Sequence, residues 1–244
     1  PTGSGKTTTL YSTLNKLESP DVNIVTVEDP IEYDLDNINQ AQINAKSGVT
    51  FASALRSILR QDPDIIMVGE VRDEETVELG IRAALTGHLV FSTIHTNDAA
   101  SGFTRLLNWN VEPFLIASTV KGILAQRLVR RVCKECRQPY EASEDELRMI
   151  GLEPQDSFEA YKGKGCLACR NTGFKGRIGI YELLLVDAEI SELVLEQAPG
   201  YKIREQARKN GMRTLLEDGI IKVNRGDTTI SEVYETLGTT KIII

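Results

Sequence analysis

Apolar residues in the first half of the chain follow two alternating patterns. Short runs of consecutive or alternating apolar residues occupy positions 23–27, 38–43, 64–70 and 88–94. Between these runs, apolar residues recur every three or four positions, which is the spacing of an amphipathic helix. Strand patterns that alternate with helical patterns predict an α/β fold over residues 1–130, with a mostly parallel sheet and flanking helices.

The pattern changes near Arg130. A short acidic helix is predicted over residues 143–152 and a strand over residues 177–186, and helical spacing then recurs from residue 190 to residue 237. We therefore expect three regions. They are the α/β core over residues 1–130, a cysteine-bearing subdomain with a returning strand over residues 131–187, and a helical region over residues 188–244.

Composition narrows the classes of function. The chain has 244 residues, 41% of them hydrophobic, which suffices for one sizeable core and a small satellite domain. A net charge of −7 disfavours a nucleic-acid-binding surface, and the one basic cluster, within residues 121–134, is interpreted as a solvated or subunit-facing stripe. The longest apolar run, residues 114–125, is shorter than the roughly 18 residues of a membrane span. With no signal peptide in the sequence, we expect a soluble, cytoplasmic protein that reaches a membrane only through partners.

The first eight residues predict a phosphate-binding loop. They match the pattern G-x-x-x-x-G-K-[ST], except that the first glycine would precede Pro1. Glycines let the loop backbone curl so that its N–H groups face a phosphate, the lysine reaches the β- and γ-phosphates, and the hydroxyl of Thr7 is placed to bind Mg²⁺. The alternative is a flexible Gly/Ser loop. The predicted nucleotide-binding residues are Gly3, Ser4, Gly5, Lys6, Thr7 and Thr8.

A phosphate-binding loop normally follows a buried strand, and here the loop opens the sequence. We therefore expect this chain to be the C-terminal part of a longer protein, with at least one core strand and further domains upstream.

Two acids and two histidines stand at predicted strand ends. Glu28 ends the first strand and is the candidate base that activates water, whereas Glu70 takes the place of the Mg²⁺-associated Walker B acid. Glu70 departs from the usual pattern because Gly69 separates it from the apolar run. One strand-end acid is usually only a loop residue, but two behind a phosphate-binding loop favour catalysis. His95 is a candidate γ-phosphate sensor at the same sheet edge, and His88, at the opposite strand end, is the weaker candidate.

The chain's four cysteines form two C-x₂-C pairs, Cys133 with Cys136 and Cys166 with Cys169. Two such pairs match a tetrahedral Zn²⁺ site with four thiolate ligands. The alternative is disulfides, with three possible connectivities, but a cytosolic protein that uses ATP keeps its thiols reduced. Because all four positions would come from the protein, the predicted Zn²⁺ is structural.

Residues 27–33, 61–73 and 86–97 resemble the Asp box, Walker B and His box of the hexameric ATPases of type II secretion and type IV pilus assembly. The resemblance extends over residues 1–237. It implies a RecA-like core, a homohexameric ring, Glu28 as base, Glu70 in Walker B, and His88 and His95 at the nucleotide. It also implies a preceding domain that supplies arginines to a neighbour's ATP. Within this chain, Arg72 and Arg82 are the possible candidates for that role.

The resemblance also implies a function. The expected protein is an ATP- and Mg²⁺-dependent motor that assembles a pilus or secretion pseudopilus at the inner membrane. Its expected partners are an inner-membrane platform protein and a cytoplasmic adaptor. The tetracysteine insertion is typical of assembly and secretion ATPases and is missing from retraction ATPases. The competing hypotheses are a nucleic-acid or conjugation motor and a non-enzymatic zinc-bearing adaptor with a degenerate phosphate loop.

Overall fold

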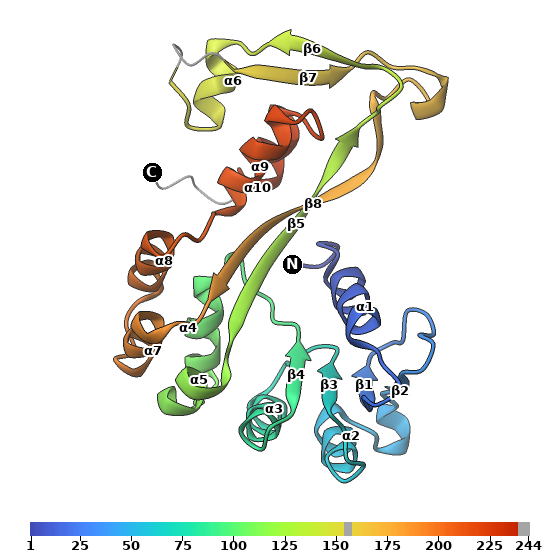
Figure 1. The fold of residues 1–244 in the computed structure, drawn as a ribbon, viewed down its shortest axis with the longest axis vertical. Helices are drawn as coiled ribbons and strands as arrows, with labels where there is room; N and C mark the ends of the chain where they lie inside the picture. The colour runs from blue at the N-terminus through green and yellow to red at the C-terminus, as the bar shows by residue number, and fades with distance from the viewer. Residues whose placement is uncertain (154–157, 239–244) are drawn as a thin grey trace. The chain divides into compact units, whose positions relative to one another are not determined.

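The computed structural model describes residues 1–153 and 158–238 (Figure 1). The chain divides into two compact units. The sheet unit contains residues 6–123 and 185–207, and the cysteine unit contains residues 1–5, 124–184 and 208–244. The predicted division into three regions remains a prediction.

The sheet unit is built on four parallel strands in the order β2-β1-β3-β4. The strands are β1 (Ile24–Glu28), β2 (Asn39–Gln42), β3 (Ile65–Val68) and β4 (Leu89–Ser92). The central strands β1 and β3 are buried at every position, because their apolar runs are covered on both faces of the sheet. The predicted α/β fold with a parallel sheet is therefore confirmed. Parallel strands also bring the ends of β1 and β3 to one edge of the sheet.

Helices cover both faces of this sheet (Figure 1). The helix α1 (Lys6–Leu17) packs through Tyr11 and Leu14 on the face that includes Ile24. On the other face, α2 (Phe51–Ile58) and α3 (Glu74–Leu85) pack against Val25 and Val27. Because side chains alternate along a strand, Thr26 and Glu28 lie on the same face as Ile24, toward α1. The remaining helices that begin in this unit are α4 (Ala100–Asn108), α5 (Pro113–Thr119), α7 (Ala188–Leu195) and α8 (Gly200–Lys209).

Polar caps set the beginnings of two of these helices. Thr50 forms a capping box with Ser53 at the start of α2. Asp73 accepts a hydrogen bond from the backbone of Thr76 at the start of α3, and Glu74 follows in the first turn. Asp73 is the last residue of the loop that carries Glu70. Its cap therefore fixes the position at which this loop ends and α3 begins.

The cysteine unit contains strands that the apolar pattern did not predict. An antiparallel pair is formed by β6 (Arg137–Glu141) and β7 (Glu159–Gly163). A long strand, β5 (Gly122–Val132), pairs with β8 (Phe174–Leu185), which is the predicted returning strand. Polar residues interrupt the alternation of apolar and polar positions that would identify β5 and β6 as strands. These segments are extended because they pair with a partner strand, and not because one apolar face is buried.

The described residues of the cysteine unit also form the helices α6 (Glu144–Met149), α9 (Leu215–Asn224) and α10 (Ile230–Leu237). Their apolar side chains form one cluster with β7, built around Ile150, Ala160, Val223, Ile230 and Val233. Within the described residues, no helix is both long enough and apolar enough to cross a membrane.

Candidate functional site: a strand-end acid pair and a tetracysteine cluster

The loop ahead of α1 has the conformation that its glycines predict. Gly3 and Gly5 have φ angles of +74° and +87°, a left-handed region that residues with a side chain rarely adopt. The carbonyl of Ser4 accepts a hydrogen bond from Gln126 Nε2 at 2.8 Å. The Ser4 hydroxyl is buried and has no hydrogen-bond partner among the described residues. A phosphate oxygen would satisfy this hydroxyl, so the loop fits an anionic ligand.

The helix α1 begins at Lys6, immediately after this loop. Lys6, Thr7 and Thr8 therefore form its first turn, whose backbone N–H groups lack intrahelical acceptors. An anion at this end is favoured both by those N–H groups and by the helix dipole. This helix end is therefore suited to an anion, and nucleotide binding by the three residues remains a prediction.

The glycine between β3 and Glu70 allows two strand ends to approach closely. Gly69 N donates to the carbonyl of Val27 at 2.8 Å. A Cβ at Gly69 would lie 3.2 Å from the same oxygen and 3.3 Å from Glu28 Cα, tighter than ordinary packing. The departure from the usual Walker B pattern therefore has a steric reason. The glycine brings the end of β3 against the end of β1.

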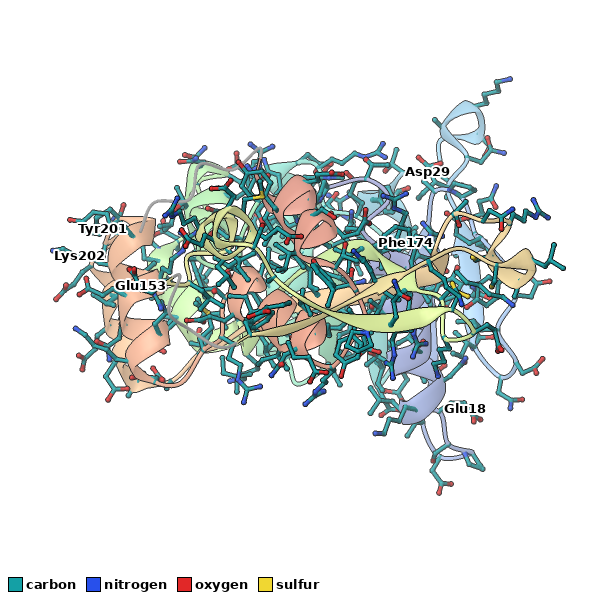
Figure 2. All side chains as sticks on the ribbon, turned by 90° about the horizontal axis from the view of Figure 1, so that it is seen from above. Glu18, Asp29, Glu153, Phe174, Tyr201 and Lys202 are labelled. Atoms are coloured by element: carbon teal, nitrogen blue, oxygen red, sulfur yellow. The ribbon has the colours of Figure 1, made fainter. Side chains whose placement is uncertain are left out.

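Glu70 lies in a cluster of charged and titratable groups. Its Oε2 accepts a hydrogen bond from Arg72 Nη2 at 2.8 Å, and its Oε1 lies 2.9 Å from His95 Nε2. Arg72 Nη1 lies 3.8 Å from the carboxylate of Asp29, which is exposed (Figure 2). The hydrogen bond from Arg72 lowers the pKa of Glu70 against the opposing effect of burial, and His95 lowers it further. Glu70 is therefore a carboxylate at neutral pH.

Glu28 lies close by in the sheet but in different surroundings. Its side chain is 3% exposed and faces α1, where Tyr11 Oη donates to Oε2 at 2.5 Å. Thr26 Oγ1 and Gln40 Nε2 donate to Oε1 at 2.7 and 3.1 Å. Sequence reasoning missed Tyr11 and Gln40. The available signal was a phenol among the leucines on the buried face of α1.

The two histidines lie at opposite ends of β4, as predicted. His95 joins the Glu70 cluster, whereas His88 Nδ1 lies 2.8 Å from the carbonyl oxygen of Ala83, beside the end of α3. Near His88, a cavity of about 530 Å³ borders β4 and is lined mostly by apolar side chains of α3, β4 and residues 118–123. The structure therefore groups His95, but not His88, with Glu70, and contacts of both histidines with nucleotide remain a prediction.

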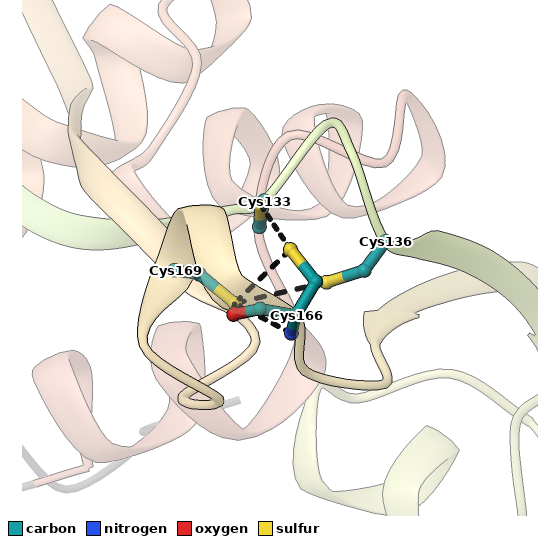
Figure 3. Close-up of side chains that lie close together, drawn as sticks. All are labelled: Cys133, Cys136, Cys166 and Cys169. Carbon is teal, nitrogen blue, oxygen red and sulfur yellow. Dashed lines mark hydrogen bonds between the residues drawn. The ribbon is translucent and has the colours of Figure 1, made fainter.

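The four cysteines lie together in the cysteine unit (Figure 3). Their Sγ atoms all lie within 4.8 Å of one another. The pairs Cys133–Cys166, Cys136–Cys169 and Cys166–Cys169 have Sγ–Sγ distances of 3.8, 3.8 and 3.7 Å. A disulfide would require about 2.05 Å. Four sulfurs around a Zn²⁺ at about 2.3 Å would be separated by roughly 3.8 Å in a tetrahedron, so the cluster is the right size for a metal ion.

Backbone donors favour one of these thiols as a thiolate. Burial alone would raise the pKa of Cys169, but the N–H groups of Cys166 and Gly173, at 3.2 and 3.3 Å from its sulfur, lower the pKa below its ordinary value. Burial raises the pKa of Cys136. A thiolate is the form that binds a metal, and N–H···S bonds commonly support it.

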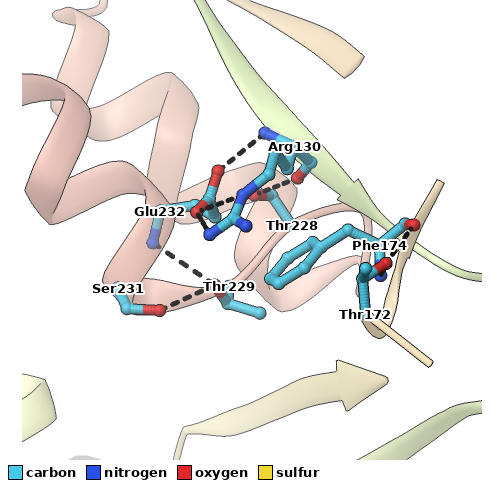
Figure 4. Close-up of polar contacts among 7 residues, drawn as sticks. All are labelled: Arg130, Thr172, Phe174, Thr228, Thr229, Ser231 and Glu232. Carbon is cyan, nitrogen blue, oxygen red and sulfur yellow. Dashed lines mark hydrogen bonds and ion pairs between the residues drawn. The ribbon is translucent and has the colours of Figure 1, made fainter. Parts of the chain in front are cut away.

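Arg130, from the basic segment, is paired within the cysteine unit (Figure 4). Its Nε and backbone N–H donate to the two carboxylate oxygens of Glu232 at 2.8 Å each, and its guanidinium carbon lies 4.3 Å from the centre of the Phe174 ring. Thr228 Oγ1 donates to the Arg130 carbonyl at 2.9 Å. The contacts of Arg130 with Glu232 and Phe174 therefore connect β5, α10 and β8. The Arg130 side chain is still 56% exposed, which agrees with the interpretation of the basic cluster as a solvated stripe, and its charge is matched by Glu232.

Comparisons with known proteins agree on one family. The family model described as "Type II/IV secretion system protein" matches residues 1–235. The type IV pilus assembly ATPase PilB of Thermus thermophilus is 52% identical over 235 residues, which are 96% of this chain and 26% of that protein. The type II secretion system ATPase E of Vibrio cholerae is 48% identical over 233 residues, 96% of this chain and 46% of that protein. The chain thus spans about half or less of the length of these relatives.

Solved structures show the same likeness. The pilus retraction motor PilT with bound ADP superposes with a TM-score of 0.71 at 30% identity, covering 97% of this chain and 59% of that one. The Legionella pneumophila ATPase DotB superposes with a TM-score of 0.70 at 25% identity, covering 98% of this chain and 58% of that one.

Proposed function

The chain belongs to the family of type II/IV secretion system proteins, and on this premise we propose that it is the ATP-hydrolysing part of a motor that assembles a type IV pilus or a type II secretion pseudopilus. The observation that carries the proposal is the carboxyl edge of the parallel sheet. Glu28 ends β1 there and Glu70 follows the neighbouring strand β3, while α1, which packs on the same sheet, begins with a lysine and a threonine. This is the set of groups that phosphoryl transfer to water requires.

Each group has a distinct role. Lys6 and the backbone around Gly5 hold the phosphates of ATP, and Thr7 provides a hydroxyl for Mg²⁺. Mg²⁺ neutralises charge that develops on the phosphates during transfer. Glu70, which is a carboxylate beside Arg72 and His95, holds the water molecules that bind Mg²⁺. Glu28 accepts the proton of the attacking water.

We further propose that the tetracysteine cluster binds one structural Zn²⁺. The proposal is supported by the sulfur–sulfur distances and by the N–H groups directed at Cys169. Four thiolates fill a tetrahedral coordination sphere, so no position is left for substrate. Such a cluster is expected of assembly and secretion ATPases, which favours assembly over retraction.

The assembled state and the partners are part of the same proposal. The relatives are named as components of secretion and pilus assembly systems. We expect a homohexamer in the cytoplasm that contacts an inner-membrane platform protein and a cytoplasmic adaptor, with contact to the membrane only through these partners. The net charge of −7 argues against the competing hypothesis of a nucleic-acid motor.

Two substitutions in the full protein test the proposed chemistry. Lys6→Ala should weaken ATP binding, because it removes the positive charge that faces the phosphates. Glu28→Gln should bind ATP as the parent does and lose roughly 10²-fold or more in turnover, since an amide is a poor base. Nucleotide affinity is measured by equilibrium binding and turnover by phosphate release, with and without DNA.

Parental turnover in Glu28→Gln would remove Glu28 from the role of base. No turnover in the parent would favour the non-enzymatic adaptor, and strong stimulation by DNA would favour the nucleic-acid motor.

A further inference from the structure

The carboxylate of Glu28 is held by neutral donors from three elements. Tyr11 of α1 donates to Oε2, while Thr26 of β1 and Gln40 of β2 donate to Oε1. A carboxylate offers about four lone-pair directions. Three are therefore occupied, and the remaining one is on Oε2, the oxygen that Tyr11 also contacts.

Tyr11 is itself held in a single orientation. The side chain is fully buried, and its ring packs edge-on against the ring of Tyr33 with 4.8 Å between centroids. Its oxygen accepts hydrogen bonds from the backbone N–H of Glu32 at 3.3 Å and from Gln40 Nε2 at 3.4 Å. Because those donors occupy the lone pairs of the phenol oxygen, the O–H is left to point at Glu28.

The phenol also stays a donor at neutral pH. Burial, followed by the hydrogen bond with Glu28, raises the pKa of Tyr11 to about 12. The ionised phenolate, which could not donate, is therefore scarce under physiological conditions.

We propose that Tyr11 is a positioning residue for the hydrolysis step: its hydroxyl fixes the rotation of the Glu28 carboxylate, so that the one free lone pair of Oε2 has a defined direction. This inference rests on the proposed function, in which Glu28 is the base. A base acts efficiently only when its acceptor atom is aligned with the proton it removes, and a small misalignment lowers the rate without changing how tightly substrate binds. Tyr11 thus connects the phosphate-binding helix with the strand that carries the base.

The test is Tyr11→Phe in the full protein, which removes the hydroxyl and keeps the ring. We expect kcat for ATP hydrolysis to fall roughly tenfold while the KM for ATP stays within about twofold, because alignment is lost and phosphate binding is retained. Tyr201→Phe, in α8, is the matched control. It removes a phenol hydroxyl from a largely exposed side chain and should leave kcat at the parental value.

A double-substitution cycle separates positioning from a general effect on structure. If Tyr11 acts through Glu28, then Tyr11→Phe combined with Glu28→Gln should be no slower than Glu28→Gln alone. Additive losses would overturn the proposal, and so would a parental kcat in Tyr11→Phe.

Gln40→Met provides a second variant in case Tyr11→Phe folds poorly, as judged by circular dichroism and thermal unfolding. Gln40 is only half-buried and donates both to Tyr11 and to Glu28, so its loss should lower kcat in the same direction, again without changing KM. An unchanged kcat in Gln40→Met would count against positioning. If Glu28→Gln alone keeps the parental rate, it is the proposed base that fails. If Glu28→Gln is slow and Tyr11→Phe is fully active, only the positioning role fails.

Discussion

At the scale of single residues, the two strand-end glutamates lie in different electrostatic surroundings. Glu70 accepts a hydrogen bond from a guanidinium and lies beside His95, whereas Glu28 is held by a phenol, a hydroxyl and an amide. A carboxylate paired with an arginine is stabilised in its charged form and accepts a proton poorly. The pairing of Glu70 with a cation therefore suits a group that holds the waters of a metal ion.

This pairing predicts the effect of Glu70→Gln. The amide keeps the shape of the side chain but loses its charge, so the Mg²⁺ concentration that gives half-maximal turnover should rise roughly tenfold, while nucleotide binding without Mg²⁺ stays at the parental affinity. The measurement is phosphate release over a Mg²⁺ titration. Glu78→Gln, which changes an exposed acid of α3, is the control. If Glu70→Gln and Glu78→Gln respond to Mg²⁺ in the same way, Glu70 does not hold the water molecules that bind Mg²⁺.

At the scale of elements, the cysteine pairs lie where strands of the cysteine unit end. Cys133 and Cys136 lie between β5 and β6, and Cys166 and Cys169 lie between β7 and β8. Cys133 N also donates to the Gly173 carbonyl at 2.9 Å, directly ahead of β8. One ion bound by four thiolates would therefore fix two turns that are far apart in the sequence, at the ends of four strands. Its binding free energy would stabilise this segment, because the unfolded chain has no such site.

The chain purified without chelator should therefore contain one Zn²⁺ for each protomer. Changing any one of the four cysteines to serine should remove most of the metal and raise the rate of proteolysis within residues 130–187 by roughly tenfold or more, as the segment opens more often. Zinc is measured by elemental analysis, and cleavage sites by mass spectrometry. Lys134→Ser, an exposed change inside the first cysteine pair, should keep the metal. A chain with no stoichiometric zinc and four titratable thiols would contradict the proposed site.

At the scale of the whole molecule, the chain contains only part of what its relatives contain. It spans 26% and 46% of the two curated relatives described above. Within the sheet, β4 pairs with β3 and is much less buried than β3, although its sequence is apolar. Among the described residues β4 stands at the end of the strand order, and a strand edge that stays unpaired is prone to aggregation.

These 244 residues expressed alone should consequently be a poor ATPase. The family resemblance implies arginines from a preceding domain at a neighbour's nucleotide, and such residues are worth roughly 10³–10⁵ in rate. We expect weak nucleotide binding, no stable hexamer and negligible turnover, all restored in the full protein. Light scattering over a concentration series and phosphate release measure the two properties. A hexamer of this chain alone that matches the full protein in rate would show that these residues suffice.

Features whose chemistry depends on short spacing were predictable from the sequence alone. The residues Gly3 to Thr8, the acids at two strand ends and the two C-x₂-C pairs are recognisable because a loop, a strand end or a metal-binding turn needs its residues within a few positions. The parallel sheet was predictable for a similar reason, because buried strands and amphipathic helices each have a local period. Tyr11, by contrast, is marked in the sequence only as a phenol among the leucines of α1, and no local spacing relates it to Glu28.

Contacts between residues that are distant in the sequence become visible only in the folded chain. Tyr11 and Gln40 reach Glu28 across three elements, and Arg72 and His95 meet at Glu70 from separate loops. The strands β5, β6 and β7 likewise exist through pairing and not through a hydrophobic period. These contacts depend on strand order, register and the face that each helix buries. Those properties are set by the packing of the whole chain, and no local pattern of residues carries them.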